Sequence, residues 1–99
     1  MKQSKIYILT FDNTEFAHNY RIVHNTVVNL SGLISWWHYI SNTYLIIIDE
    51  KLKATDIAKR VSKKISSKFF ISEINIQNSN GLLPEKAWDW INKQKDILK

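Results

Sequence analysis

The stretch WWHYISNTYLIII, residues 36–48, decides the fold, because it has the form of two β-strands joined by a two-residue turn. β-branched and aromatic residues fill both halves, as is usual in strands. Ser41-Asn42 separates the halves, and asparagine tolerates the positive φ of a tight hairpin turn. We therefore predict a hairpin with strands at 33–40 and 43–48. The first strand carries three aromatic residues and a histidine within four positions, so it supplies either a core or a binding surface.

The segments before the hairpin predict a strand and a helix. Residues 5–11 (KIYILTF) form a short apolar run with β-branched and aromatic residues, which indicates a strand. A helix is expected from Glu15, and glycine in Ser31-Gly32 is the usual residue beyond a helix end. The apolar positions of this helix recur at intervals of three and four: Phe16, Tyr20, Val23, Val27 and Leu30.

The segments after the hairpin repeat the order helix and strand, and then add a helix. Ile57, Val61 and Ile65 recur every four residues and predict a helix over 54–65. A strand is expected at 68–77 (KFFISEINIQ). Pro84 suits the first turn of a last helix, whose apolar side holds Ala87, Trp88 and Ile91.

The resulting order βαββαβ plus a helix predicts the α+β class. Two βα units joined by a hairpin are typical of a ferredoxin-like βαββαβ sandwich, here with an additional C-terminal helix, in a single domain over residues 1–99. In that fold two helices cover one face of an antiparallel sheet, and we expect the other face to be open. A domain this small usually buries such a face against a partner, so we predict a homodimer.

Alternation of side chains along the strands divides the residues between the two faces. Pairing about Ser41-Asn42 sets Ile40 opposite Thr43 and Trp37 opposite Ile46, which predicts Trp37, Tyr39 and Tyr44 under the helices. The mainly apolar alternate positions of the other strands are expected there too: Tyr7, Leu9, Phe11, Ile46, Ile48, Phe70, Ser72, Ile74 and Ile76. The sets that contain polar groups are expected together on the open face: Thr10, Asp12, Trp36, His38, Glu73 and Asn75.

The net charge of +5 is concentrated in one segment. Between Lys51 and Lys68 there are seven basic residues and one acidic residue, Asp56. Such an excess attracts anionic partners, so Lys59 and Lys63 are candidate ligand-binding residues for a nucleotide or nucleic acid. The alternative is the solvated face of a surface helix.

Composition excludes several classes of site. The chain has no cysteine, which excludes disulfides and thiolate zinc sites. No apolar run is long enough for a transmembrane helix, and no signal-peptide core follows the first residues, so we expect no membrane partner and a cytoplasmic location. Two isolated glycines make no phosphate-binding loop. The residues predict no metal-ligand set and indicate no particular cofactor.

Trp36 and His38 are the sharpest candidates for function. A tryptophan on a sheet can stack on a base, and the alternative is an interface tryptophan. Histidine can act as a general base or bind phosphate when it is protonated. The alternative for His38 is a side chain packed at a subunit contact. Thr10 and Glu73 complete the predicted ligand-binding surface.

The run Trp36-Trp37-His38-Tyr39 and the ending LLPEKAWDW, residues 82–90, resemble a family of small bacterial proteins labelled "SinR family". The resemblance covers nearly the whole chain. The label implies a helix-turn-helix regulator, whereas the strand pattern of this sequence favours an α+β fold.

The layout is also similar to that of the ferredoxin-fold nucleases of CRISPR adaptation and the VapD toxins. Those families place an aspartate at the end of the first strand, and two such carboxylates in the dimer can hold a metal. Asp12 occupies the matching position here. The alternative for Asp12 is a helix cap.

Three functions follow from these features. The first is a non-catalytic homodimer that binds a nucleotide or nucleic acid at its open sheet face or dimer cleft, in phage defence or counter-defence. The second is a metal-dependent ribonuclease or phosphodiesterase, in which Asp12 of each subunit and His38 would be catalytic. The third is an antitoxin or inhibitor that binds another protein by its sheet face or edge.

Overall fold

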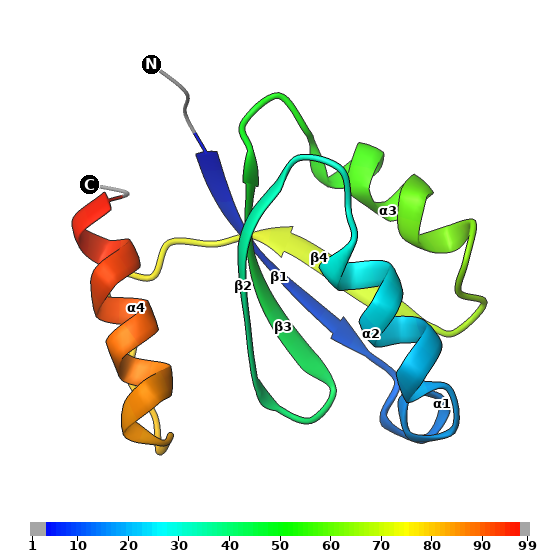
Figure 1. Cartoon of the computed structure of the whole chain (residues 1–99), viewed down its shortest axis with the longest axis horizontal. Helices are drawn as coiled ribbons and strands as arrows, with labels where there is room; N and C mark the ends of the chain where they lie inside the picture. Colours follow the sequence, from blue (N-terminus) through cyan, green and yellow to red (C-terminus); the bar gives the residue numbers. More distant parts are fainter. Residues whose placement is uncertain (1–3, 98–99) are drawn as a thin grey trace.

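The computed structural model of the chain describes residues 4–97, apart from the side chains of 14–16 and 97. Four strands form one antiparallel sheet in the order β2-β3-β1-β4 (Figure 1). The strands are β1 (Ser4–Phe11), β2 (Leu33–Ile40), β3 (Thr43–Asp49) and β4 (Phe69–Glu73). The helices are α1 (Asn13–His18), α2 (Tyr20–Val28), α3 (Ala54–Ser62) and α4 (Glu85–Ile97). The predicted α+β class and the order of the elements are confirmed.

The hairpin turn at Ser41-Asn42 is confirmed, but the pairing beyond it is not as predicted. Ile40 lies opposite Thr43, as expected, whereas Trp37 lies opposite Leu45 and Trp36 opposite Ile46. The register shifts because β2 has one residue more than β3 between the pair Trp37–Leu45 and the pair Ile40–Thr43. The pairing of β2 is irregular again between Leu33 and Ser35. A slip of one residue moves side chains to the opposite face of a sheet.

One face of the sheet is covered by α2 and α3 (Figure 1). The predicted placement of the apolar residues of β1 and β3 under these helices is confirmed. The buried residues of this first core come from two strands and two helices: Tyr7, Leu9, Phe11, Tyr44, Ile46, Ile48, Val23, Val27, Ile57 and Val61.

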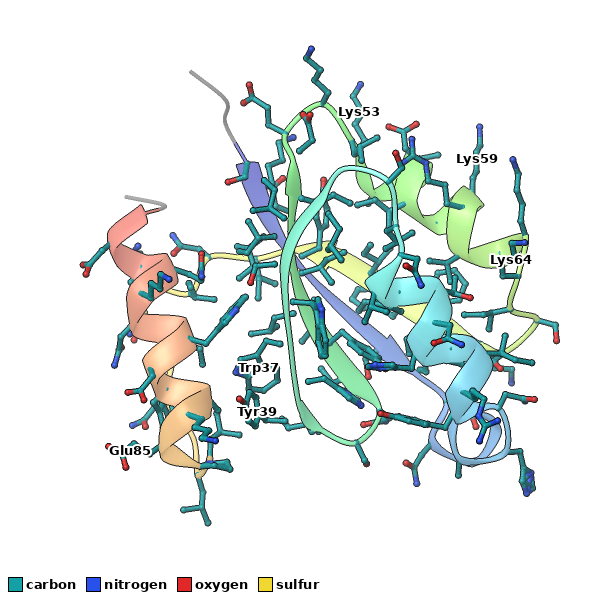
Figure 2. All side chains as sticks on the ribbon, viewed as in Figure 1. Trp37, Tyr39, Lys53, Lys59, Lys64 and Glu85 are labelled. Carbon is teal, nitrogen blue, oxygen red and sulfur yellow. The ribbon has the colours of Figure 1, made fainter. Side chains whose placement is uncertain are left out.

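The opposite face is covered in part by α4, so the expectation of an open face is wrong (Figure 1). Trp37 is 3% exposed and lies here, not under α2 and α3 as predicted. Figure 2 shows Trp37 and Tyr39 on the side of β2 that faces α4. The indole Nε1 of Trp37 donates to the Ala87 carbonyl (3.3 Å), which ties β2 to α4. The rest of this second core is apolar: Ile6, Leu45, Ile47, Ile76, Ala87 and Ile91.

Strand β4 is shorter than predicted, and its two faces are reversed. Glu73 lies opposite Tyr7 and Phe70 lies opposite Thr10. Glu73 therefore faces the α2 and α3 side, not the side of Thr10. The prediction assigned the uniformly apolar set to the face under α2 and α3. Because α4 supplies a second apolar layer, Ile76 is instead buried on the α4 side.

The predicted helix from Glu15 to Leu30 is two helices. Asn19 has φ −119° and ψ 26°, which breaks the helical path between α1 and α2. Its carbonyl accepts the Val23 amide hydrogen at 3.0 Å, so α2 begins directly after it. Gly32 has φ +89°, and a Cβ there would lie 3.0 Å from Leu52 Cδ1, so the turn into β2 requires glycine.

The other helices differ less from the prediction. Helix α3 ends at Ser62, three residues earlier than predicted. Asp56 accepts a hydrogen bond from the Lys53 amide at the start of α3 (2.9 Å), which satisfies one unpaired backbone donor. Within residues 4–97, none of the helices has the length and apolar character that a bilayer crossing requires.

We expect Trp37→Ala to lower the free energy of unfolding by about 3–5 kcal/mol, because it empties the centre of the second core. Urea unfolding followed by circular dichroism measures this change. The matched control is Trp36→Ala on the same strand, which should cost markedly less because Trp36 is 41% exposed. A Trp37→Ala protein as stable as the wild type would contradict burial of this side chain under α4.

Candidate functional site

Five rings from three elements meet on the α2 side of the hairpin, and we call them the ring cluster: Tyr20 and His24 of α2, Trp36 and His38 of β2, and Tyr44 of β3. His38 stacks on Tyr44 with centroids 4.0 Å apart and planes 7° apart. Tyr20 stacks on His24 at 5.5 Å and on His38 at 5.8 Å. His24 meets Trp36 edge to face at 5.3 Å. The cluster is therefore a continuous set of ring contacts between α2 and the hairpin.

The local sequence explains why these rings converge. The shifted register of β2 turns Trp36 toward the α2 face, where it lies opposite Ile46. Tyr20 and His24 are four residues apart, so they lie on one side of α2. Val23 and Val27 of the same helix are fully buried and hold α2 against the sheet.

Hydrogen bonds fix the orientation of the imidazole rings of His24 and His38. His24 Nδ1 lies 2.9 Å from the Tyr44 hydroxyl, and His38 Nδ1 lies 3.0 Å from the Thr43 carbonyl oxygen. A carbonyl oxygen only accepts, so the Nδ1 of His38 carries a proton. In the neutral ring the lone pair is therefore on Nε2, which is the nitrogen able to accept a proton or a hydrogen bond.

The ring cluster has a buried floor and an exposed top. Tyr44 is fully buried, and burial raises the pKa of its hydroxyl, with a smaller increase from the neighbouring Tyr20. Tyr20 and Trp36 are 44% and 41% exposed, and both histidines are half-buried. Exposed aromatic rings with imidazole nitrogens beside them can stack on a planar ligand and hydrogen-bond to it.

Thr10 and Asp12 lie at the same end of the sheet as His38. Thr10 Oγ1 is 3.1 Å from Thr43 Oγ1, while the Thr43 carbonyl accepts from His38. The Asp12 amide donates to the Lys68 carbonyl at 2.9 Å, and the Asp12 side chain is exposed. Thr43 thus connects Thr10 with His38. The predicted single surface of Thr10, Trp36 and His38 is wrong, since the shifted register of β2 places the two ring residues on the opposite face from Thr10.

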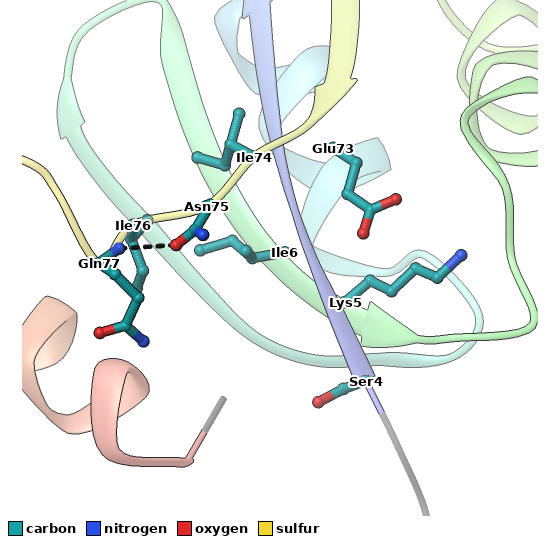
Figure 3. Close-up of a pocket in the computed structure, with 8 residues that line it drawn as sticks. All are labelled: Ser4, Lys5, Ile6, Glu73, Ile74, Asn75, Ile76 and Gln77. Carbon is teal, nitrogen blue, oxygen red and sulfur yellow. Dashed lines mark hydrogen bonds between the residues drawn. The ribbon is translucent and has the colours of Figure 1, made fainter. Parts of the chain in front are cut away.

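Glu73 lies elsewhere, in a pocket of about 480 Å³ where β4 leaves the sheet (Figure 3). Its pairing partner Tyr7 is three residues from Thr10 along β1, which corresponds to about 10 Å. Burial and then the Glu73 carboxylate raise the pKa of Tyr7. The pocket is lined by the start of β1 and the segment after β4: Ser4, Lys5, Ile6, Glu73, Ile74, Asn75, Ile76 and Gln77.

The predicted cations Lys59 and Lys63 lie on α3 or at its end, and both are exposed. Figure 2 shows Lys59 extending from α3 into solvent. Helix α2 lies between α3 and the hairpin (Figure 1), so neither lysine joins the ring cluster. The prediction missed Tyr20 and His24, which the spacing of four residues beside a buried helical stripe could have indicated.

The α4 side has a separate, apolar groove of about 330 Å³ between the sheet and α4. Ile8, Ile40 and Trp88 are among its lining residues. Ile40, which lines the groove, is 46% exposed, and Phe70, which lies opposite Thr10 outside the groove, is 62% exposed. The part of this face that α4 leaves uncovered thus keeps exposed apolar side chains, with Thr10 and Thr43 between Ile40 and Phe70. We call Ile8, Ile40 and Phe70 the apolar strip.

Comparisons with known proteins give no relative: no protein-family model, no curated protein and no solved structure matches the chain. Among the residues whose placement is described, no group of three or more His, Asp or Glu side chains could hold a metal ion.

The raised pKa of Tyr44 predicts a loss of stability in alkali. Above its ordinary pKa of 10.0, Tyr44 ionises in the unfolded chain while the folded protein still holds it neutral, so the unfolded state is favoured. We expect the free energy of unfolding to fall between about pH 9 and about pH 11, by up to about 1.4 kcal/mol per pH unit for each such tyrosine. Urea unfolding across this range measures it.

The matched variant is Tyr44→Phe, which keeps the ring and removes the ionisable hydroxyl. Its stability should fall less over the same pH range, and Tyr7 should account for the remaining loss. Equal alkaline losses in the wild type and in Tyr44→Phe would contradict the assignment to Tyr44.

Proposed function

We propose that the protein is a non-catalytic homodimer that binds a nucleotide or nucleic acid. The observation that carries this proposal is the ring cluster, in which an exposed tryptophan and tyrosine lie beside two histidines over the buried Tyr44. Aromatic side chains bind bases by stacking, which is worth about 1–3 kcal/mol per base. The net charge of +5 favours an anionic ligand. Phage defence or counter-defence remains the predicted setting.

A ferredoxin-like arrangement is part of the proposal. The support is the sheet order β2-β3-β1-β4, in which β1 and β2 run parallel with β3 between them, and β3 and β4 run parallel with β1 between them. Each parallel pair is joined through helices, which makes two split βαβ units. The division of the first helical segment into α1 and α2 and the packing of α4 on the second face are additions to that plan.

The ligand site proposed here differs from the one expected on an open sheet face. Trp36 and His38 are on the side of α2, so the ligand would lie over the hairpin and α2. The apolar strip on the other face is then available for the second subunit. Exposed apolar groups that adjoin an apolar groove are typical of subunit interfaces.

Trp36→Ala should weaken binding of an oligouridine of about eight nucleotides by about five- to 150-fold, the equivalent of one lost stacking contact. Fluorescence anisotropy of the labelled oligonucleotide measures the dissociation constant. The matched control is Tyr39→Ala on the same strand, because Tyr39 is 42% exposed but contacts Trp37 on the α4 side. Equal affinities of the wild type and Trp36→Ala would show that the ring cluster is not part of the binding site.

The homodimer is tested by light scattering coupled to size-exclusion chromatography. We expect a mass of twice 11.7 kDa for the wild type and of 11.7 kDa for Phe70→Lys, which puts a charge in the apolar strip. Ile22→Lys is the control, since Ile22 is also an exposed apolar residue but lies on α2. A wild type that elutes as a monomer at all concentrations is the result that refutes the dimer.

The other hypotheses remain predictions: the metal-dependent nuclease with Asp12 of each subunit, the protein-binding inhibitor, and the family resemblance. Asp12 is exposed at the end of β1, so a second subunit could approach it. Magnesium- or manganese-dependent cleavage of RNA that disappears in Asp12→Asn is the result expected of the nuclease.

A further inference from the structure

We infer that the ligand is a single-stranded nucleic acid several nucleotides long that crosses α2, with bases on the ring cluster and phosphates in a groove between α2 and α3. This inference rests on the proposed function and narrows its ligand from nucleotides in general to an oligonucleotide. The groove has a volume of about 400 Å³. The residues that line it are polar or basic apart from Leu30, although carbon atoms make up most of the surface that they expose to the groove: Asn25, Thr26, Asn29, Leu30, Ser31, Arg60 and Lys64.

The charge of the groove suits phosphate. Arg60 and Lys64 are its two cations, and no acidic side chain is among the residues that line it. Lys59 and Lys63 lie outside the groove on α3 and its end, and they extend the positive field around it. Phosphates of a nucleic acid that approach this region are therefore attracted before they make contact.

A hydrogen bond fixes the position of the Arg60 side chain beside the groove. Its Nη1 donates to the Ser31 carbonyl oxygen at 2.9 Å, which fixes the side chain across the gap between α3 and the end of α2. A guanidinium has five N–H donors in a planar fork, so donors beyond this one bond suit the paired oxygens of a phosphate. Arg60 is half-buried, so it loses less conformational freedom on binding than an extended surface side chain would.

The ring cluster and the groove lie on opposite flanks of α2. Tyr20 and His24 are on the flank toward β2, whereas Thr26 lines the groove toward α3. Successive residues of a helix are about 100° apart. This spacing places the exposed Arg21 and Asn25 on the outer surface of α2 between the two flanks. A strand that crosses α2 thus meets aromatic, basic and amide side chains in turn.

The width of the helix sets the length of the ligand. An α-helix with its side chains is about 10–12 Å across. A stacked strand of nucleic acid advances about 3.4 Å per nucleotide, so about three or four nucleotides are needed to reach from one flank to the other. A mononucleotide is too short to occupy both sites, whereas an oligonucleotide can.

The test compares uridine monophosphate with a labelled oligouridine of about eight nucleotides, at salt concentrations from about 50 to about 200 mM. We expect the oligonucleotide to bind the wild type at least about tenfold more tightly than the monophosphate. Arg60→Gln and Lys64→Gln should each weaken binding of the oligonucleotide by about three- to tenfold, because each removes one phosphate contact. Each should also reduce the slope of log affinity against log salt by about 0.7, the value for one phosphate contact in a single strand. Binding of the monophosphate should change less than about twofold, because its base stays on the ring cluster.

Controls separate loss of contact from loss of fold. Lys86→Gln removes the same charge from an exposed position on α4, the far side of the sheet, and should leave affinity and salt slope unchanged. Lys64 is itself exposed, so Lys64→Gln tests the groove even if Arg60→Gln destabilises the contact with Ser31. An oligothymidine of the same length distinguishes RNA from DNA, and binding of either supports the inference.

The outcomes distinguish this inference from the proposed function. If both groove variants keep the wild-type affinity and salt slope while Trp36→Ala weakens binding, the crossing path is wrong and the ring cluster remains a nucleotide site. Equal affinities for the monophosphate and the oligonucleotide also overturn the crossing path. If the wild type binds neither probe, both the inference and the proposed function are wrong.

Discussion

The bulged pairing of β2 with β3 determines the surroundings of the aromatic side chains in the hairpin. One additional residue in β2 sets Trp37 against Leu45 and turns Trp36 toward Ile46. Trp37 then becomes the centre of the core under α4, and Trp36 becomes the exposed wall of the ring cluster. Without this irregularity the two tryptophans would exchange faces. The second core and the candidate site therefore depend on the same local feature of one strand.

The helices and strands themselves were largely predictable from the sequence, because each follows from a short-range pattern of residues. The apolar run at 5–11 and the turn at Ser41-Asn42 correspond to β1 and to the hairpin. The stripe of Val23 and Val27 also predicts the buried side of α2. The predicted helix is wrong where a single residue interrupts it, as at Asn19, whose backbone departs from helical geometry. Helical periodicity alone cannot detect such a break, since the apolar spacing continues across it.

The composition of the candidate site was less predictable, because it depends on tertiary arrangement. Trp36 and His38 were identified from the sequence, but their neighbours Tyr20 and His24 come from a helix whose rotation relative to β2 no local pattern specifies. Thr10 and Glu73 were expected beside them on a face that α4 was not expected to cover. The last helix was predicted correctly as an element, but its site of packing depends on the apolar surface that β2 and β4 present to it. Apolar alternation in a strand does not reveal which of two layers will cover it.

The division of the protein into two cores has a consequence for the order in which it folds during synthesis. All the buried residues of the first core lie between Tyr7 and Ile65, so they leave the ribosome before α4 does. The second core needs Ile76, Ala87 and Ile91, which are translated last. During that interval the α4 face of the sheet, with Trp37, Leu45 and Ile47, is uncovered and able to associate with other nascent chains. Docking of α4 after its release from the ribosome therefore ends the exposure of this surface.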